Sequence, residues 1–527
     1  MTPRPPVGAW FLLLALSAPA LWAGLSGTPA RAEQPETQVE LDQRRLAHSA
    51  PVIEQIGPIT MPDAGRTGAN ADASPPLPTA TEAPDEMDDH LLGGLWGARH
   101  WMAHQGITLD VQEVDELWAN VTGGSASAGD GGKGSGTGPY YDGVTLVTLG
   151  LDLEKIMGLR GGLFNISALQ THGRSISQDH LALFNPVSGY EADRSTRLFE
   201  LWYQQSFLDN TLDIKIGQQD LDTEFLISNY GALYLNANMG WPVAPSNNLY
   251  SGGPSWPLSS PAIRVRYRPN DSLSILVAAA DDNPAGVRYN AFTVQHGGNT
   301  ADPTNQTAMD GSGTLFNMNT GALLMAEIQY AINPGPGHVG LPGIYKLGGY
   351  YDTADFPDYR YNTSGIPLGS AQDTTASPRM VAGNWLIYAV IDQMLWRPAP
   401  DSARSIGAFT RVTGSGPSIS TQISFAVDMG INFNAPFRSR LNDTLGLGWG
   451  LGQASSGLRQ YDRTARLPVQ NTETYIELTY QAQILPWCTL QPDFQYIFNP
   501  SGGVLDWTHQ HTVQNEAIFG LRSSVTF

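Results

Sequence analysis

The segments that decide the fold read Leu212-Asp-Ile-Lys-Ile-Gly217 and, further along the chain, Ile263-Arg-Val-Arg-Tyr-Arg268. In both segments apolar residues alternate with charged ones. Because successive side chains of a β-strand point to opposite faces, this period of two predicts a strand with one apolar and one polar face. Similar alternation runs through residues 197–207, where we expect Phe199 on the apolar face, and through residues 473–484. The chain is therefore predicted to be all-β.

The connections between the predicted strands distinguish a membrane barrel from a soluble β-sandwich, which alternates in the same way. They are short at 209–210 and 269–271 and long at about 220–260 and 281–319. Short turns at one end and long loops at the other are typical of outer-membrane barrels. The candidate strands begin near residues 105, 141, 161, 195, 211, 261, 272, 320, 342, 383, 404, 420, 441, 471, 489 and 514. The sequence thus predicts a closed antiparallel transmembrane β-barrel of 16 strands, with both chain termini on the periplasmic side.

The first 90 residues differ from the rest in composition. Residues 1–32 have the features of a signal peptide: Arg4, a short apolar run at Trp10–Leu16, and Ala30-Arg31-Ala32 as the cleavage site. The apolar run is too short for a membrane helix, which needs about 20 residues. Residues 33–90 are rich in Pro, Ala and acidic residues, so we expect a disordered periplasmic linker. The barrel should then occupy residues 91–527, in the outer membrane of a Gram-negative bacterium after cleavage near Ala32.

Composition and motifs exclude several classes of function. The chain has 29 Lys and Arg against 49 Asp and Glu, which argues against nucleic acid as a partner. Its single cysteine, Cys488, supports neither a disulfide framework nor a cysteine-based metal site. Since the sequence also lacks the G-x-S-x-G and H-E-x-x-H motifs, we expect no enzyme, no metal site and no cofactor. Two alternatives from other classes stay open: an outer-membrane barrel enzyme whose dyad assembles in space, and a secreted β-sandwich that binds glycans.

Several segments, in order along residues 91–527, resemble the carbohydrate-selective porins of the OprB type. The segments are Leu92-Gly-Gly-Leu-Trp-Gly-Ala-Arg99, Gly106-Ile-Thr-Leu109, Asn120-Val-Thr-Gly-Gly124, Leu198-Phe-Glu-Leu-Trp-Tyr-Gln-Gln205, Lys215-Ile-Gly-Gln-Gln-Asp220, Glu224-Phe225, Gly343-Ile-Tyr-Lys-Leu-Gly-Gly-Tyr-Tyr-Asp352 and the run from Ile484 to Pro500. The resemblance implies a sixteen-stranded barrel narrowed by inward-folded loops that passes monosaccharides, glucose among them, by facilitated diffusion. It also implies that outer-membrane lipid and lipopolysaccharide surround the barrel. The terminal Phe527 resembles the signal read by the barrel assembly machinery.

The polar faces of the strands near residues 195, 211 and 261 supply the candidate residues for selectivity. A sugar presents hydroxyl groups and C–H faces, so a channel for it needs hydrogen-bonding groups and aromatic surface. The pore-lining candidates are Glu200, Trp202, Gln204, Asp213, Lys215, Arg264, Arg266 and Arg268, together with Trp241 and Trp256 in the long loop before residue 260. Two alternatives are open: the strand residues merely line a wet, nonspecific pore, or the two tryptophans belong to the membrane interface or to loop packing. The porin could also serve another small polar or anionic solute.

Overall fold

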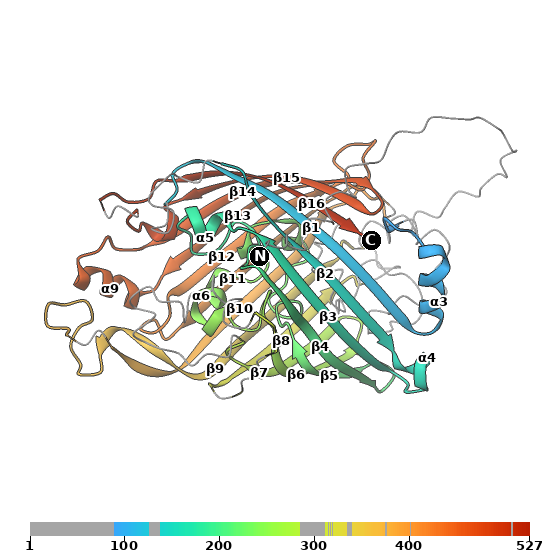
Figure 1. Ribbon diagram of the computed structural model, residues 1–527, viewed down its shortest axis with the longest axis horizontal. Coiled ribbons are helices and arrows are strands. Elements are labelled where there is room, and N and C mark those ends of the chain that lie inside the picture. Colours follow the sequence, from blue (N-terminus) through green and yellow to red (C-terminus); the bar gives the residue numbers. More distant parts are fainter. Residues whose placement is uncertain are drawn as a thin grey trace, which may run out of the picture. The chain divides into compact units, whose positions relative to one another are not determined.

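The computed structural model describes residues 89–125, 138–284, 311–314, 316, 318, 320–334, 340–374, 377–400, 402–506 and 510–527. Sixteen strands lie within these residues: β1 (Ile107–Thr122), β2 (Tyr140–Asp152), β3 (Gly162–Gly173), β4 (Ser195–Phe207), β5 (Leu212–Gln219), β6 (Ser260–Asn270), β7 (Leu273–Asp281), β8 (Ala322–Ile332), β9 (Gly343–Asn362), β10 (Pro378–Trp396), β11 (Ser405–Gly416), β12 (Ile423–Asn434), β13 (Thr444–Ala454), β14 (Thr472–Leu485), β15 (Cys488–Phe498) and β16 (Glu516–Thr526). Each strand pairs antiparallel with its neighbour in the chain, and β1 pairs with β16, so the sheet closes into a barrel (Figure 1). This confirms the predicted fold class.

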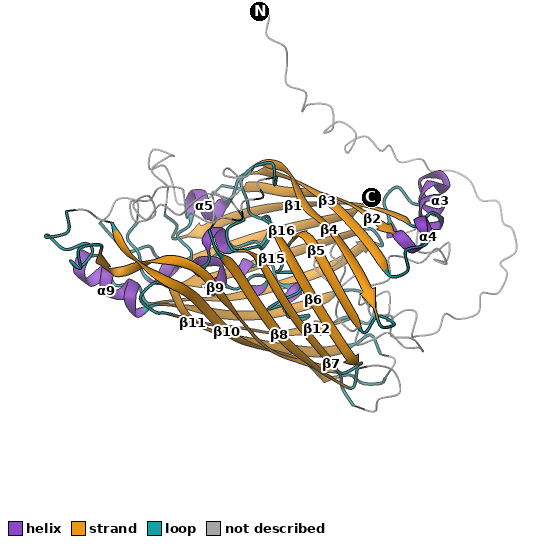
Figure 2. Cartoon of the chain, turned by 90° about the horizontal axis from the view of Figure 1, so that it is seen from below, coloured by secondary structure: helices purple, strands orange, loops and turns teal. Residues whose placement is uncertain are grey.

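The helical segments are short and belong to the connections between strands or to the stretch before β1. In the described residues they are η3 (Leu95–Gly97), α3 (Ala98–His104), α4 (Leu153–Met157), α5 (Ile176–His180), η5 (Gly231–Leu233), η6 (Ala237–Met239), α6 (Val243–Asn248), η7 (Tyr250–Gly252), α9 (Ser456–Ala465) and η9 (Pro500–Gly502). Figure 2 places α3 and α4 at one end of the barrel and α9 at the other. None of the described helices has both the length and the hydropathy of a membrane span.

The predicted alternation of short and long connections is confirmed. The turn between β4 and β5 consists of residues 208–211, whereas residues 220–259 separate β5 from β6. The start and the end of the barrel segment meet at the end that carries the short turns. There Leu91 N donates to Thr526 O and Phe527 N donates to Val111 O, both at 2.8 Å. The predicted signal peptide at 1–32 and the linker at 33–90, apart from its last two residues, lie outside the described residues.

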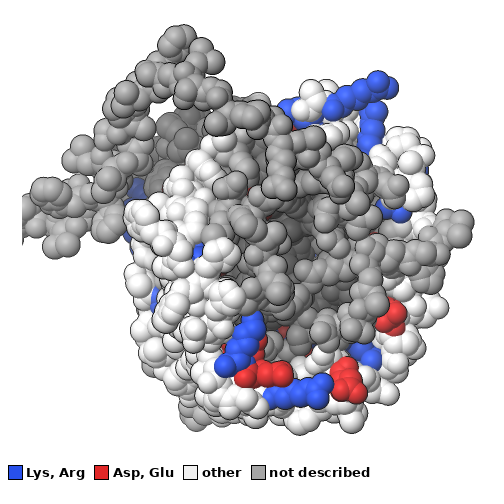
Figure 3. All heavy atoms as spheres, turned by 90° about the vertical axis from the view of Figure 1, so that its right-hand side faces the viewer, with Lys and Arg blue, Asp and Glu red and all other residues white. Residues whose placement is uncertain are grey.

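The two faces of the wall differ as the alternation predicts. Ile216 and Ile263 point outward and are 54% and 44% exposed, whereas Lys215 and Arg264 beside them point inward and are buried. Figure 3 looks onto the end of the barrel with α3 and α4, where most of the visible described atoms belong to uncharged residues and the charged side chains gather at a few places on the rim. An apolar exterior around a polar interior is the arrangement that a membrane barrel requires.

One expectation about the faces is wrong. Phe199 points inward and is buried, as is the next residue, Glu200. The pairing of β3 with β4 shifts here, because Ala168 lies opposite Leu198 but Ile166 lies opposite Leu201. Two residues of β4 therefore face a single residue of β3, which is a β-bulge. The alternation within one strand cannot predict the extra residue, because a bulge is defined by the register between two paired strands.

Candidate functional site

The long connection between β5 and β6, residues 220–259, lies inside the barrel; we call it the inner loop. Its hydrogen-bond partners include Glu327 on β8, Asp392 on β10 and Glu477 on β14, which lie three, five and seven strands away from β5 around the closed sheet. Since the loop reaches side chains on both sides of the barrel, it crosses the interior. The family resemblance implied inward-folded loops, and this connection is one of them.

The inner loop brings its own apolar side chains to the wall. Leu221, Phe225 and Leu226 are fully buried and belong to one cluster with Leu276 of β7 and Leu323 of β8. Burying a side chain of this size contributes about 1.5–3 kcal/mol. The apolar residues at the start of the loop therefore fix it against β7 and β8.

On the opposite side, β13 makes room for the loop with glycines. Four successive inward-pointing residues of the strand are glycines: Gly446, Gly448, Gly450 and Gly452. A Cβ atom on Gly448 would lie 2.8 Å from Tyr234 Cε1 and 2.8 Å from Met239 Cε of the inner loop. These distances are shorter than carbon–carbon contacts allow, so the loop packs directly on the backbone of β13.

On the side of β5 and β6 the inner loop is held by ion pairs. Glu224 of the loop pairs with Lys215 of β5 and with Arg264 Nε of β6, the latter at 2.6 Å. Asp213 of β5 accepts from Arg264 and, at 2.8 Å, from Arg266 Nε. These five side chains, which we call the near network, are each at most 1% exposed. A buried ion pair is tolerated only when its members are fully paired in this way.

The electrostatics of the near network favour an ionised Glu224. Burial alone would raise the pKa of this carboxyl group, but the positive charges of Arg264 and Lys215 outweigh it and lower the pKa to about 2. The carboxylate is therefore charged at neutral pH and holds both cations against the loop.

From β8 around to β14, wall side chains bond to the backbone of the inner loop. Carboxylates on β8, β10 and β14 accept from loop N–H groups: Glu327 from Leu226 at 3.1 Å, Asp392 from Asn229 at 3.0 Å and Glu477 from Leu235 at 2.5 Å. Arg411 of β11 donates to the carbonyl oxygens of Leu226 at 2.9 Å and Gly240 at 2.8 Å, and also to that of Asn238. Its charge is balanced by Asp428 of β12, whose Oδ2 lies 3.1 Å from Arg411 Nη2.

A second inward segment, between β3 and β4, supports the inner loop. Gly189 N donates to Leu235 O at 3.1 Å, and Ala237 N donates to Pro186 O at 3.2 Å. Phe184 N in turn donates to Glu473 of β14 at 3.0 Å. The two segments thus form one layer across the interior.

The structure brings the predicted strand residues together on the inner side of the wall. Gln204 accepts from Arg264 Nη2 at 2.9 Å, and Lys215 Nζ lies 5.0 Å from the centre of the Trp202 ring. Glu200 accepts from the backbone N–H of Asp220 at 3.2 Å, where the inner loop begins. Most of the set is covered by the loop, whereas the Arg268 side chain is 11% exposed and lies 3.7 Å from Asp213.

The two loop tryptophans have different surroundings. Trp241 is buried, and its Nε1 donates to Gly252 O at 2.8 Å within the inner loop. Trp256 is half-buried and meets the Tyr190 ring edge to face, with 5.6 Å between the ring centres. Neither lies at the membrane interface, because both belong to the layer inside the barrel.

Residues that the sequence reasoning did not propose for the site also hold the inner loop. They are Glu224, Glu327, Asp392, Arg411, Asp428 and Glu477. Glu477 lies in the alternating segment 473–484, but its partner could not be identified because the loop that it binds is more than 200 residues away in the chain. The alternating glycines of β13 were a readable signal for a close approach from inside the barrel.

Comparison with known proteins agrees with this geometry. The family model described as "Carbohydrate-selective porin, OprB family" matches residues 137–527. Porin B of Pseudomonas aeruginosa is 28% identical over 470 residues, covering 85% of this chain and 93% of that protein. A putative porin of Acinetobacter baylyi, QuiX, is 24% identical over 444 residues, covering 78% of this chain and 89% of that protein.

Among solved structures, the high-pH structure of Pseudomonas putida OprB is similar in fold. Its TM-score is 0.69 at 22% identity, with 85% of this chain and 100% of that chain covered. The family and these relatives indicate a channel rather than an enzyme. The chain belongs to the OprB family of carbohydrate-selective porins and is an outer-membrane β-barrel porin.

Proposed function

We propose that this porin passes small carbohydrates, monosaccharides such as glucose, by facilitated diffusion past the inner loop. The observation that carries the proposal is the attachment of this loop to both sides of the barrel. A loop fixed in this way narrows the channel permanently, so a solute has to fit beside it. Conduction also requires weak contacts, since a tightly bound sugar would not leave.

We propose that the ten predicted site residues contribute to selectivity in two different ways. Arg268 and Trp256 are half-buried, so they are suited to touch a passing sugar through a guanidinium and a ring face. The other eight are buried, so they act by holding the wall and the inner loop in place. These eight are Glu200, Trp202, Gln204, Asp213, Lys215, Arg264, Arg266 and Trp241.

Single-channel conductance with glucose block separates the two roles. Arg268→Gln and Trp256→Ala should weaken the block while leaving ion conductance nearly unchanged. Arg266→Ala and Trp202→Ala should change both, because they loosen the support of the inner loop. Arg160→Ala is the control, since Arg160 lies on the rim with 85% of its side chain exposed. Unchanged block in both Arg268→Gln and Trp256→Ala, with normal assembly, would refute the assignment of direct contacts.

A second candidate, a porin for small anionic solutes, is favoured by Arg268 alone. Its nearest carboxylate is 3.7 Å away and is shared with Arg264 and Arg266, so its charge is the least compensated of the three. A carboxylate solute such as gluconate should then block the channel more strongly than glucose does. The sugar proposal expects the reverse order, and the same recordings decide between them.

We also propose that Phe527 is read during assembly and that the signal peptide is removed near Ala32. Phe527 directly follows β16, the strand that closes the barrel against β1, and its N–H donates to Val111 O of β1 at 2.8 Å. Phe527→Ser should lower the assembled fraction in heat-modifiable gel mobility, and N-terminal sequencing of the mature protein should begin near residue 33. Binding of lipopolysaccharide to the outer wall belongs to the same proposal and can be measured by co-purification.

A further inference from the structure

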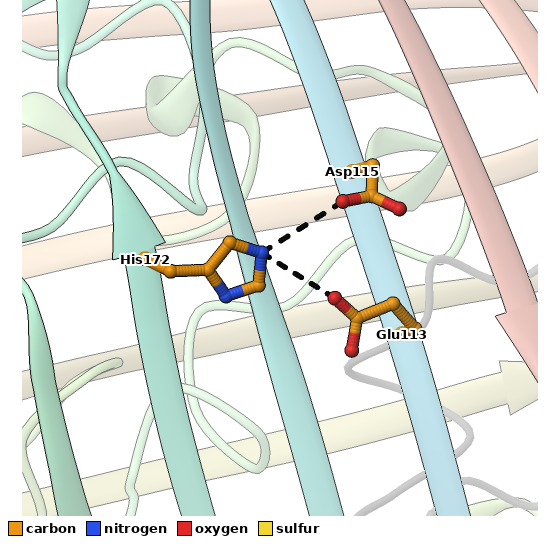
Figure 4. A group of neighbouring side chains, drawn as sticks. All are labelled: Glu113, Asp115 and His172. Carbon is orange, nitrogen blue, oxygen red and sulfur yellow. Dashed lines mark ion pairs between the residues drawn. The ribbon is translucent and has the colours of Figure 1, made fainter. Parts of the chain in front are cut away.

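A group of polar side chains lies on the outer face of the wall, away from the inner loop. Glu113 and Asp115 belong to β1 and His172 belongs to β3, and all three point toward one another across β2 (Figure 4). Their neighbours Gln112 and Val114 are buried on the inner face, so the three residues occupy the outward positions of the alternation. We call Glu113, Asp115 and His172 the outer cluster.

The ligand atoms of the outer cluster converge. His172 Nε2 lies 3.4 Å from Glu113 Oε1 and 3.7 Å from Asp115 Oδ1 (Figure 4). One atom from each of the three residues can be chosen so that all lie within 4.8 Å of one another. Within the described residues no other group of three His, Cys, Asp or Glu side chains meets this condition.

Neighbouring side chains fix the orientation of the histidine ring. Gln170 Nε2 donates to Thr171 O at 3.2 Å, which leaves its Oε1 directed at His172 Nδ1 at 3.0 Å. An amide oxygen only accepts, so Nδ1 carries the hydrogen and Nε2 faces the carboxylates. Nε2 therefore faces the Tyr141 hydroxyl at 3.0 Å and the two carboxylates behind it. The hydroxyl hydrogen is directed to Asp115, so the lone pair of Nε2 and the carboxylates repel one another unless a cation, either a proton or a metal ion, lies between them. A histidine whose other nitrogen is fixed by a hydrogen bond is the usual form of a metal ligand.

The carboxylates are oriented as well. Thr145 Oγ1 donates to Glu113 Oε2 at 2.5 Å, and Tyr141 Oη donates to Asp115 Oδ1 at 2.5 Å. Thr145 therefore holds the oxygen of Glu113 that faces away and leaves Oε1 directed at the histidine. Both donors lie on β2, between the strands that carry the three ligands.

The surroundings of the outer cluster make a bound cation favourable. Leu117 and Val147, also on the outer face, are 48% and 39% exposed, so the carboxylates lie in an apolar wall. Charges on the membrane-facing side of a barrel are costly, most at mid-depth and less near an interface. The cluster lies near the ends of β2 and β3 that lead into long connections, where a metal ion can arrive from water.

We propose that Glu113, Asp115 and His172 bind a divalent transition-metal ion of the Zn²⁺ type on the outer wall of the barrel. One imidazole nitrogen and two carboxylate oxygens at this spacing suit Zn²⁺ and leave a fourth position for water. Ca²⁺ and Mg²⁺ prefer oxygen ligands throughout and are disfavoured by the imidazole. No short sequence motif predicts this site, because the ligands are brought together by the pairing of β1 with β2 and of β2 with β3.

Calorimetric titration of the detergent-solubilised porin with ZnCl₂ tests the proposal. We expect one Zn²⁺ per chain and, because the imidazole must be deprotonated, a proton release that appears as a dependence of the heat on the buffer. His172→Gln and Asp115→Asn should each weaken binding at least tenfold, and CaCl₂ should give no comparable heat.

His511→Gln is the matched control, since His511 faces a single carboxylate, Asp506, at 3.9 Å. Its Zn²⁺ affinity should equal that of the unaltered protein. Heat-modifiable gel mobility checks that each variant barrel is assembled. If His172→Gln or Asp115→Asn does not assemble, Glu113→Gln takes its place in the titration. Binding that is absent in the unaltered porin, or that is unaffected by His172→Gln, would mean that the outer cluster holds a proton only and would overturn the proposal.

Discussion

The inner loop is attached to the two sides of the barrel in different ways. Toward β5 and β6 a loop side chain, Glu224, pairs with wall cations. Toward β8, β10, β11 and β14 the wall side chains bond mainly to the loop backbone. The near attachment therefore depends on one charged side chain of the loop. The far attachment rests mainly on the loop backbone, and neutral loop side chains add to it, such as Ser228, which donates to Asp392. Variants on each side test whether this difference has consequences.

The largest effect is expected from Arg411→Ala. The substitution removes the donors to three loop carbonyl groups and leaves Asp428 buried without its cation. Removing one member of a buried pair costs about 3–5 kcal/mol. We expect the inner loop to leave its position, with a several-fold rise in single-channel conductance and loss of glucose block. An assembled Arg411→Ala barrel with ordinary conductance would show that the far attachment is not needed.

A smaller effect is expected from Gly448→Val. The added side chain would overlap Tyr234 and Met239 of the inner loop. Overpacking of this kind costs about 1–3 kcal/mol. Chymotrypsin should then cleave the assembled barrel faster within residues 220–259. Leu447→Val, on the outward face of the same strand, is the control and should leave the cleavage rate unchanged.

Glu224→Gln tests the near attachment. Glutamine keeps the shape but removes the charge that Lys215 and Arg264 face. Losing hydrogen bonds to a charged group costs about 1.5–3 kcal/mol, and Arg264 retains Asp213, so we expect the lower end of that range. Chymotrypsin protection of the loop should fall less than in Arg411→Ala. A larger loss than in Arg411→Ala would reverse the proposed ranking of the two attachments.

The smallest effect is expected from mild acid. The pKa of Glu224 is about 2 in the folded protein and 4.5 in its unperturbed form, so the stabilisation from this carboxylate is fully present above pH 4.5 and disappears as the pH falls toward 2. The difference in stability between the unaltered porin and Glu224→Gln should therefore be constant from pH 7 to pH 5 and shrink below that. A difference that already shrinks between pH 7 and pH 5 would contradict an ionised, fully paired Glu224.

The sequence predicted the strands well and the contacts across the barrel poorly. Alternation identifies a strand from neighbouring residues, and the predicted starts at 195, 211 and 261 lie within one residue of β4, β5 and β6. It also placed Lys215 and Arg264 on the inner face correctly. The hydrogen bond between Glu477 and Leu235 joins residues 242 positions apart, and no local pattern encodes such a pair.

The sequence also could not predict that most of the candidate site residues are buried. The same alternation describes a polar side chain that meets water in a pore and one that meets a loop folded over it. Lys215 and Arg266 belong to the second kind, and only the position of the inner loop reveals it. The outer cluster is a comparable case, since its carboxylates stand at positions where alternation predicts apolar residues.

The bulge in β4 means that the chain has one residue more than the pairing of β3 with β4 needs. Deleting Phe199 would place Glu200 opposite Ser167, whose hydroxyl already accepts from Glu200 N at 3.1 Å, and would leave every other side chain of β4 on its present face. Elsewhere in a strand, a one-residue deletion turns all residues on one side of it to the wrong face. A gene that loses one codon would therefore be expected to yield a closed barrel when the loss falls at position 199 and to fail when it falls at most neighbouring positions of β4.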